Sequence, residues 1–254
     1  MIEFLKKTAG KAGAYQLEKF NTDLLVSRKK DSSMVSEVDK NSEEMIMEAV
    51  RKEYPGCSFV CEESGETGES DFDGYTFIID PLDGTSNYLH GVPLFAVSIG
   101  VMRKGEIEAG VIYNPAMQEM YYAAKNGGAF LNGKPIRVSE VNEIKNGLFG
   151  TGFYYSRDEK LRINLERFYR VQYESLGVRR PGAAAIDLAW TACGRYDAFW
   201  ETGLHSWDMA AGALLVKEAG GTLSSTNGSG FDIFGRDILA TNTILHNDMV
   251  EILN

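Results

Sequence analysis

Two carboxylates, which follow a predicted buried strand, are the side chains of this chain with the clearest potential for chemistry. Residues 75–79 are all aromatic or β-branched, as is typical of strands, and Pro81 has no N–H to continue a ladder of hydrogen bonds. We therefore predict that the strand ends at Asp80. Asp80 and Asp83 lie three residues apart across a turn, so both can reach one hard cation, and the carbonyl of Leu82 offers a further oxygen. This pattern predicts a site for a divalent metal ion.

The residues after Asp83 are typical of a turn that binds phosphate. Gly84 lets the backbone approach an anion closely, and Thr85 and Ser86 are predicted to begin a helix, whose unpaired N–H groups can bind phosphate. The alternative is an ordinary strand-to-turn junction, because Asp-Pro and Asp-Gly are common turn dipeptides.

Two segments resemble the signatures of one family. Asp80–Thr85 resembles the DPxDGT signature of the inositol monophosphatase superfamily, the lithium-sensitive, magnesium-dependent phosphatases. Trp207–Gly212, followed by Glu218–Gly221, resembles the family's second signature, WDxAAG ending in Gly-Gly. Two signatures in the expected order are more specific than either alone, and the similarity extends over nearly the whole chain.

Two further acidic segments also resemble family elements. Ser58–Ser64 reads as a short apolar strand that ends in Glu62 and Glu63, and it resembles the family's GEES element. The resemblance implies that Glu62 binds metal and that Glu63 lies close behind it. Without the resemblance, two adjacent glutamates are more typical of a solvated loop.

Met34–Asp39 resembles the family's DLVTxxD stretch, which makes Asp39 the candidate partner of Thr85. The alternative is that Asp39 is a helix N-cap, because it is followed by acidic residues and then by apolar residues at the spacing of one helix face. One side chain can fill both roles.

The resemblance implies a role for each member of a larger set of site residues. The implied catalytic residues are Asp39, Thr85 and Glu63. The implied metal ligands are Glu62, Asp80 and the Leu82 carbonyl for one Mg²⁺, Asp80, Asp83 and Asp208 for a second, and a weaker third ion near Glu62. The implied substrate-binding residues are Asp83, Gly84, Thr85, Gly182, Ala183, Ala184, Glu201 and Asp208. Thr85 and Asp39 would accept the proton of an attacking water, and no covalent phosphoenzyme is expected.

The substrate contacts leave alternatives open. Glu201 matches a position that binds substrate hydroxyls, although a strand-end acid without such a role fits as well. Arg180 could face a phosphate or a dimer partner, or could lie in a solvated turn. We interpret His205 as structural and expect Trp207 to pack in the core. The segment 154–157 could distinguish between related substrates.

Composition excludes several other classes of protein. A net charge of −10 argues against broad nucleic-acid binding, and 44% hydrophobic residues can build a substantial core. Cys57, Cys61 and Cys193 form no CxxC pair, which favours a reducing compartment and argues against a zinc site. Residues 2–20 read as an amphipathic helix without the apolar core of a signal peptide, and no run approaches the ~20 apolar residues of a membrane span. We therefore expect a cytoplasmic protein that does not enter a membrane.

The expected fold class is α+β (mixed α/β), and the resemblance implies a layered α-β-α-β-α sandwich of the inositol monophosphatase and fructose-1,6-bisphosphatase type. We predict an N-terminal half over residues 1–140, with an antiparallel sheet and most metal ligands, and a C-terminal α/β half over residues 141–254. Helices are predicted near 2–20, 41–54, 157–170, 182–194 and 207–219. Further strands are predicted at 95–102, 106–113, 119–124, 129–131, 134–138 and 196–201.

The function implied by the resemblance is magnesium-dependent hydrolysis of a small phosphorylated metabolite by a homodimeric enzyme, with inositol 1-phosphate as the favoured substrate. Relatives that share the motifs act on fructose 1,6-bisphosphate, histidinol phosphate, 3′-phosphoadenosine 5′-phosphate or NADP. A non-enzymatic alternative is a regulatory binding protein associated with the transcription machinery.

Overall fold

Two large β-sheets lie in different layers of the molecule. The computed structural model describes residues 1–28, 34–68, 74–153 and 158–254, and in these residues it contains an eight-stranded and a five-stranded sheet. In spatial order, the larger sheet consists of β10 (Lys134–Pro135), β9 (Ala129–Leu131), β8 (Glu119–Ala124), β7 (Glu106–Asn114), β6 (Ala96–Arg103), β5 (Thr76–Asp83), β3 (Ser58–Cys61) and β4 (Gly65–Thr67). Neighbouring strands are antiparallel except for the parallel pair of β3 and β5.

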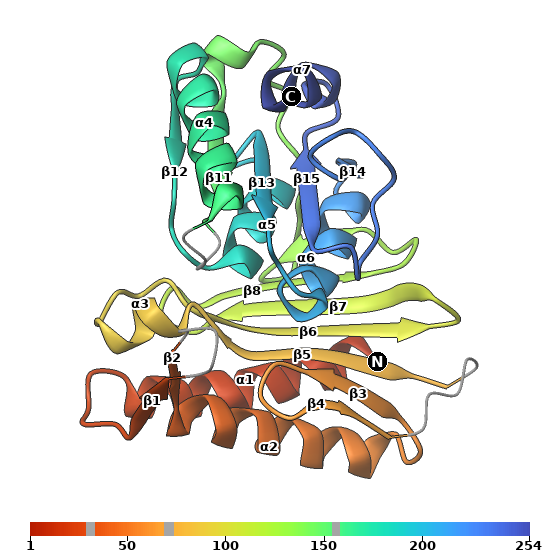
Figure 1. Cartoon of the computed structure of the whole chain (residues 1–254). Coiled ribbons are helices and arrows are strands. Elements are labelled where there is room, and N and C mark those ends of the chain that lie inside the picture. Colours follow the sequence, from red (N-terminus) through yellow and green to blue (C-terminus); the bar gives the residue numbers. More distant parts are fainter. Residues whose placement is uncertain (29–33, 69–73, 154–157) are drawn as a thin grey trace.

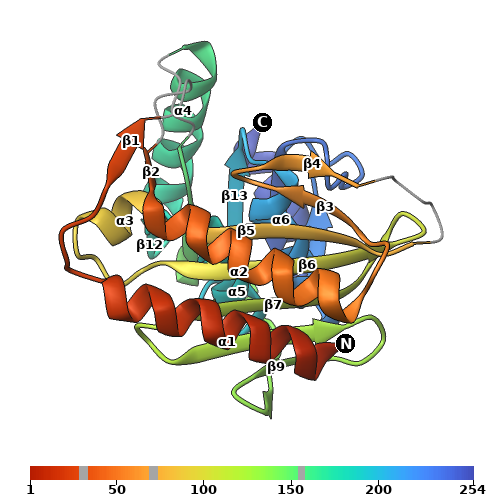
Figure 2. The ribbon, with the colours of Figure 1, turned by 90° about the horizontal axis from the view of Figure 1, so that it is seen from below.

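Two long helices cover one face of the larger sheet, as Figures 1 and 2 show: α1 (Ile2–Lys19) and α2 (Glu37–Glu53). Each helix buries one stripe of apolar residues, such as Leu5 and Ala9 on α1 and Ile46 and Val50 on α2, against the apolar side chains of the sheet. Gly13 lets α1 approach closely, because a Cβ atom at this position would lie 2.6 Å from the ring of Tyr113.

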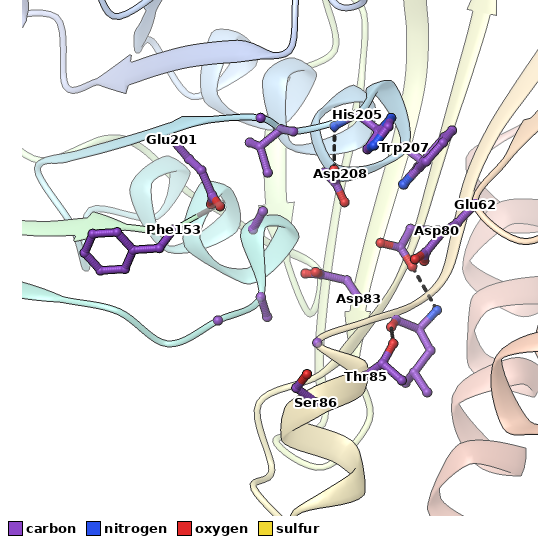
Figure 3. Close-up of a pocket in the computed structure, with 18 of the residues that line it drawn as sticks. Glu62, Asp80, Asp83, Thr85, Ser86, Phe153, Glu201, His205, Trp207 and Asp208 are labelled. Carbon is purple, nitrogen blue, oxygen red and sulfur yellow. Dashed lines mark hydrogen bonds between the residues drawn. The ribbon is translucent and has the colours of Figure 1, made fainter. Parts of the chain in front are cut away.

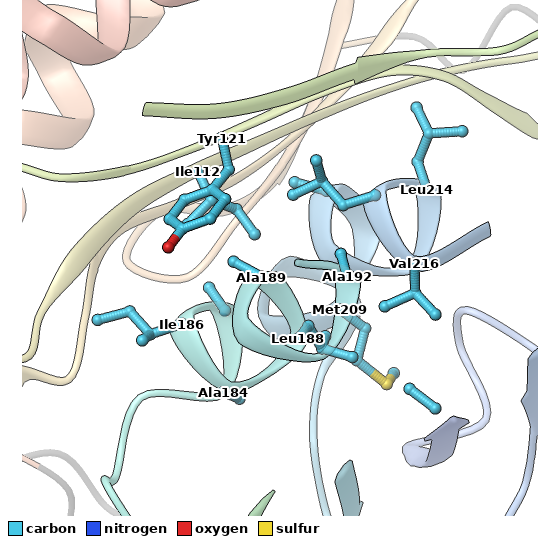
Figure 4. Close-up of a cluster of buried hydrophobic side chains, with 14 of the residues drawn as sticks. Ile112, Tyr121, Ala184, Ile186, Leu188, Ala189, Ala192, Met209, Leu214 and Val216 are labelled. Atoms are coloured by element: carbon cyan, nitrogen blue, oxygen red, sulfur yellow. The ribbon is translucent and has the colours of Figure 1, made fainter. Parts of the chain in front are cut away.

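The opposite face of the larger sheet is covered by α5 (Ala184–Ala192) and α6 (Ser206–Glu218), which lie between the two sheets (Figure 1). These helices are rich in alanine and are buried nearly all round, as expected for helices with a sheet on each side. Figure 4 shows the cluster they form, in which Ala189 of α5 lies beside Ile112 and Tyr121 of the larger sheet, and Leu188 and Met209 lie on the side of the helices away from that sheet.

The smaller sheet completes the sandwich. Its strands, in spatial order, are β12 (Gly177–Arg179), β11 (Leu148–Thr151), β13 (Ala198–Thr202), β15 (Asp237–Thr241) and β14 (Thr222–Ser224). Its outer face is covered by α4 (Glu159–Glu174) and α7 (His246–Leu253). The remaining described elements are the hairpin of β1 (Val26–Arg28) and β2 (Met34–Ser36), the short helix α3 (Thr85–Leu89) and the 3₁₀ turn η1 (Ile144–Asn146).

The layers therefore follow the order α-β-α-β-α, which confirms the predicted fold class. Strands of the larger sheet end at Pro135 and those of the smaller begin at Leu148, but the division into two domains at residue 140 stays a prediction. Among the described residues, none of the helices has both the length and the apolar character that a membrane span needs.

Several element boundaries differ from the sequence predictions. The helix expected from residue 41 begins at Glu37, because Ser36 caps it, and the strand expected over 134–138 contains two residues. The strand that we predicted to end at Asp80 continues to Asp83, so this prediction was wrong. The backbone passes Pro81 through a β-bulge, in which a proline needs no ladder hydrogen bond.

A pair of glycines determines how closely α6 packs on the sheet. Gly100 on β6 and Gly110 on β7 are cross-strand partners, and Cβ atoms at these positions would lie 2.6 Å from Ala210 Cβ and 2.8 Å from Ala211 Cα. The helix therefore lies directly on the glycine backbone.

We expect the substitution Gly110→Ala to destabilise the protein by about 1–3 kcal/mol, because the added methyl overlaps helix backbone and cannot be accommodated by a side-chain rotation. Gly10→Ala is a matched control on α1, where a Cβ meets nothing within 4 Å, and should stabilise by about 0.5–1 kcal/mol. Denaturant unfolding of both variants checks this, and equal stabilities would contradict the close packing.

Candidate active site

The β-bulge in β5 brings Asp80 and Asp83 to the same cavity. Asp80 pairs with Ser98 and Asp83 with Ala96. The two residues of β5 between these pairs, Pro81 and Leu82, therefore lie opposite a single residue of β6, Val97. The N–H of Leu82 donates to Asp80 Oδ1 at 3.0 Å, which fixes the first carboxylate within the bulge.

The cavity has a volume of about 590 Å³ and lies between the larger sheet and the N-terminal ends of α5 and α6 (Figure 3). Glu62 and Asp80 point toward one another on one side of it, and Glu201 and Phe153 lie on the opposite side. Its lining includes five acidic side chains and two arginines: Glu62, Asp80, Asp83, Glu201, Asp208, Arg180 and Arg236.

Three of the carboxylates form a tight cluster. Ligand oxygens of Asp80, Asp83 and Asp208 all lie within 4.8 Å of one another. Asp83 accepts a hydrogen bond from the N–H of Ala185 at 2.8 Å, and Asp208 accepts one from the N–H of His205 at 2.6 Å. The first turns of α5 and α6 thus hold two of the three carboxylates in place.

The electrostatic environment of this cluster is unfavourable for three negative charges. Burial, followed by the charges of Glu62, Asp83 and Asp208, raises the pKa of Asp80 well above its usual value. Burial likewise raises the pKa of Asp208 and brings the pKa of Asp83 to about 7. A bound cation would offset this cost, so the cluster has the chemistry of a divalent metal site made of oxygen ligands.

Asp39 connects α2 to the same region. It is the third residue of the helix, where its carboxylate accepts hydrogen bonds from the N–H of Ser36 at 2.7 Å and from the hydroxyl of Thr85 at 2.9 Å. The N-cap of this helix is Ser36, and Asp39 completes a capping box with it while contacting Thr85. Asp39 is fully buried, and burial raises its pKa.

The residues expected at the phosphate lie where the bulge ends. Gly84 has a positive φ of 85° and precedes α3, and a Cβ atom there would lie 2.7 Å from the Leu94 carbonyl oxygen. Only glycine fits this position without strain. The Thr85 hydroxyl also lies 3.1 Å from the Leu82 carbonyl oxygen, and both Gly84 and Thr85 line the cavity.

The residues expected at the rest of the substrate also line the cavity. Gly182, Ala183 and Ala184 form the turn into α5, with Ala183 as its N-cap. Burial raises the pKa of Glu201 to about 8, although the charge of Arg180 acts in the opposite direction. Of the alternatives for Arg180, the structure supports a position at the cavity.

Other predicted residues lie elsewhere or play a different part. Glu63 does not line the cavity, and its N–H donates to Glu43 at 2.9 Å, so a catalytic role for it stays a prediction. Residues 154–157 lie outside the described residues.

The sequence analysis missed several cavity residues. Trp207 lines the cavity instead of packing in the core, and it stacks on His205 with 4.4 Å between ring centroids. Trp207 is the first residue of the second signature and His205 lies two residues before it, and this position was the signal that could have placed them. Phe153 and Arg236 also line the cavity, but no sequence pattern distinguishes them.

We expect the metal-free protein to lose stability as the pH rises. The pKa of Asp83 is about 7 in the folded chain against about 3.9 in an unfolded one, so the folded state binds this proton more tightly. The contribution of this proton to the free energy of unfolding is complete below about pH 4 and is lost as the pH rises through about 7. In Asp83→Asn, whose side-chain oxygen still accepts the Ala185 N–H, melting temperature in a chelator should fall less between pH 5 and 8. Equal slopes in both proteins would contradict the assignment.

Comparison with known proteins places the whole chain in one group. A model of the inositol monophosphatase family matches residues 1–254. The inositol-1-monophosphatase of Mesorhizobium japonicum is 40% identical over 253 residues, which cover 99% of this chain and 95% of that relative. The Nus factor SuhB of Pseudomonas aeruginosa is 43% identical over 240 residues, which cover 93% and 88% of the two chains.

Solved structures agree over the full length. The extragenic suppressor protein suhB from Bartonella henselae superposes with a TM-score of 0.94 at 39% identity, covering 100% of this chain and 98% of the other. The IMPase of Thermotoga maritima gives a TM-score of 0.92 at 31% identity, covering 100% and 96%. The match over the whole chain, together with these relatives, shows that the protein belongs to the inositol monophosphatase family.

Proposed function

We propose that this protein hydrolyses a small phosphate monoester with magnesium as cofactor, and that inositol 1-phosphate is its substrate. The observation that carries the proposal is the cluster of Asp80, Asp83 and Asp208 beside the hydrogen-bonded pair of Thr85 and Asp39. Two relatives named inositol-1-monophosphatase, at 40% and 42% identity, support the choice of substrate.

The acidic residues of the cavity fit magnesium, which prefers carboxylate and carbonyl oxygen ligands. We assign Glu62, Asp80 and the Leu82 carbonyl to one ion, and Asp80, Asp83 and Asp208 to a second, with a third held more weakly near Glu62. When bound, the ions supply positive charge against the anionic oxygens of the phosphate and polarise water.

Thr85 and Asp39 provide a path for a proton. The Thr85 hydroxyl donates to Asp39 at 2.9 Å, so Thr85 can accept a proton from water in the cavity while its own proton moves to Asp39. The raised pKa of Asp39 makes this carboxylate a better proton acceptor than an exposed aspartate.

The two sides of the cavity suit the two parts of such a substrate. We assign the phosphate to Gly84 and Thr85, next to the acidic cluster, and the polyol to Gly182, Ala183, Ala184 and Glu201. Glu201 can accept hydrogen bonds from hydroxyl groups, whereas the side chain of Ala183 offers none. Two predictions complete the proposal: a homodimeric state, which the resemblance implies, and a cytoplasmic location, which the cysteine pattern and the character of residues 2–20 favour.

A second candidate function is regulatory binding, because one relative is named Nus factor SuhB and two more are named putative Nus factor SuhB. A protein that only binds a partner does not need its acidic cavity, whereas this chain keeps the full set of Asp39, Glu62, Asp80, Asp83, Thr85 and Asp208 together. The arrangement therefore favours an enzyme.

A phosphate-release screen with and without magnesium tests the proposal. The substrates are inositol 1-phosphate, fructose 1,6-bisphosphate, histidinol phosphate, 3′-phosphoadenosine 5′-phosphate and NADP. We expect the highest kcat/KM with inositol 1-phosphate and no turnover without magnesium. Release from none of the five would favour the regulatory alternative.

We expect Thr85→Ala to lower kcat by about 100-fold or more with little change in KM, because its hydroxyl acts mainly in the transition state. Thr85→Ser retains the hydroxyl and is the matched control, which should keep most of the activity. Steady-state kinetics of both variants provide the measurement. An unchanged kcat in Thr85→Ala would remove Thr85 and Asp39 from the mechanism.

We also expect lithium to inhibit uncompetitively or non-competitively against substrate. Lithium resembles magnesium in size but carries half its charge, so it can replace the ion assigned to Asp80, Asp83 and Asp208 and retain the product. Rates measured at several lithium and magnesium concentrations check this. Purely competitive inhibition, or none at all, would argue against that second site.

A further inference from the structure

One face of α2 contacts both segments that carry predicted site residues. Asp39, Glu43 and Met47 follow one another at intervals of four residues and therefore lie on the same side of the helix. Asp39 accepts the Thr85 hydroxyl, as described above. Met47 Sδ accepts a hydrogen bond from the Ser64 hydroxyl at 3.7 Å, in the turn between β3 and β4.

Glu43 lies between these two contacts and holds the same turn. It is 4% exposed, and its carboxylate accepts two backbone hydrogen bonds: Oε2 from the N–H of Glu63 and Oε1 from the N–H of Ser64, each at 2.9 Å. Both oxygens are thus committed to adjacent peptide groups. Such a paired arrangement fixes the orientation of the peptide as well as its distance from the helix.

Glu62 is the residue immediately before the two whose N–H groups Glu43 accepts. Its own N–H donates to the Ile79 carbonyl at 3.1 Å, on the strand that leads to Asp80. The backbone of Glu62 is therefore held on its N-terminal side by β5 and on its C-terminal side by Glu43. The side chain lines the cavity and points toward Asp80 (Figure 3).

We propose that Glu43 is a positioning residue for Glu62, and that it sets the affinity of the cavity for a divalent cation. This inference rests on the metal site of the proposed function. Glu43 does not line the cavity, so its effect passes through the backbone of the 62–64 turn. If the turn is released, Glu62 samples positions away from Asp80, and the cation loses one ligand for part of the time.

Three variants separate this role from a general effect of charge. Glu43→Gln has the same size, but its amide group faces one of the two N–H donors, which loses its acceptor. Glu43→Asp keeps the charge but is too short to reach both N–H groups. Glu44→Gln removes the same charge from an exposed position on the same helix and is the matched control.

Two measurements apply to each variant: amide hydrogen exchange of residues 62–65 without metal, and binding of Mg²⁺ alone by calorimetry. We expect faster exchange confined to the turn, and a Kd for Mg²⁺ weakened by about 10–100-fold in Glu43→Gln, as is typical when a residue that orients a metal ligand is lost. Glu43→Asp should be intermediate, and Glu44→Gln should match the wild type. If Glu43→Gln fails to fold, Glu43→Asp carries the same comparison.

Several results would overturn the inference. Faster exchange with an unchanged Kd would reduce Glu43 to a stabiliser of the turn, and unchanged exchange would show that the two hydrogen bonds do not hold it. A wild-type protein that binds no Mg²⁺ would also remove the inference. By contrast, a wild type that binds Mg²⁺ but releases no phosphate would remove the proposed function and leave the role of Glu43 standing.

Discussion

The burial of several carboxylates around one cavity is the constraint on which the rest of the structure depends. Each member of the cluster accepts at least one backbone N–H, from Leu82 to Asp80, from Ala185 to Asp83 and from His205 to Asp208. These donors offset part of the free-energy cost of burying the carboxylates. The pKa values are still raised, because desolvation and repulsion between the negative charges outweigh the hydrogen bonds. Protons on these carboxylates or a cation among them would offset the remaining cost of burying the negative charges.

Three successive layers of the fold, the larger sheet and the helices on its two faces, contribute to holding these charges in place. The bulge in β5 turns Asp80 and Asp83 into one cavity, and the glycine backbone under α6 lets the helix that carries Asp208 pack directly on the same sheet. From the other face of the sheet, α1 holds the bulge itself, because buried Gln16 donates to the Pro81 carbonyl at 2.7 Å. The site is therefore assembled from elements on both faces of one sheet.

The sequence predicted that Asp80, Asp83 and Asp208 lie together, because the two signatures that contain them occur in the order expected for one family, and such a combination is rare by chance. It predicted the course of the chain at Pro81 poorly, since a proline that ends a regular ladder can also lie in a bulge. Only the structure could separate the two. Glu43 could not be recognised from the sequence either, because its role depends on two N–H groups of a turn 20 and 21 residues away. Long-range backbone contacts of this kind leave no local pattern.

The central claim is that Asp80, Asp83 and Asp208 together bind a divalent cation. A crystal structure of the protein soaked with Mn²⁺, analysed by anomalous scattering, tests this most directly. We predict an anomalous peak among the three carboxylates, at roughly 2.0–2.3 Å from an oxygen of each, a range typical of small divalent cations with oxygen ligands. A map with no peak in the cavity, and with the carboxylates bridged only by water or by Arg180, would contradict the account.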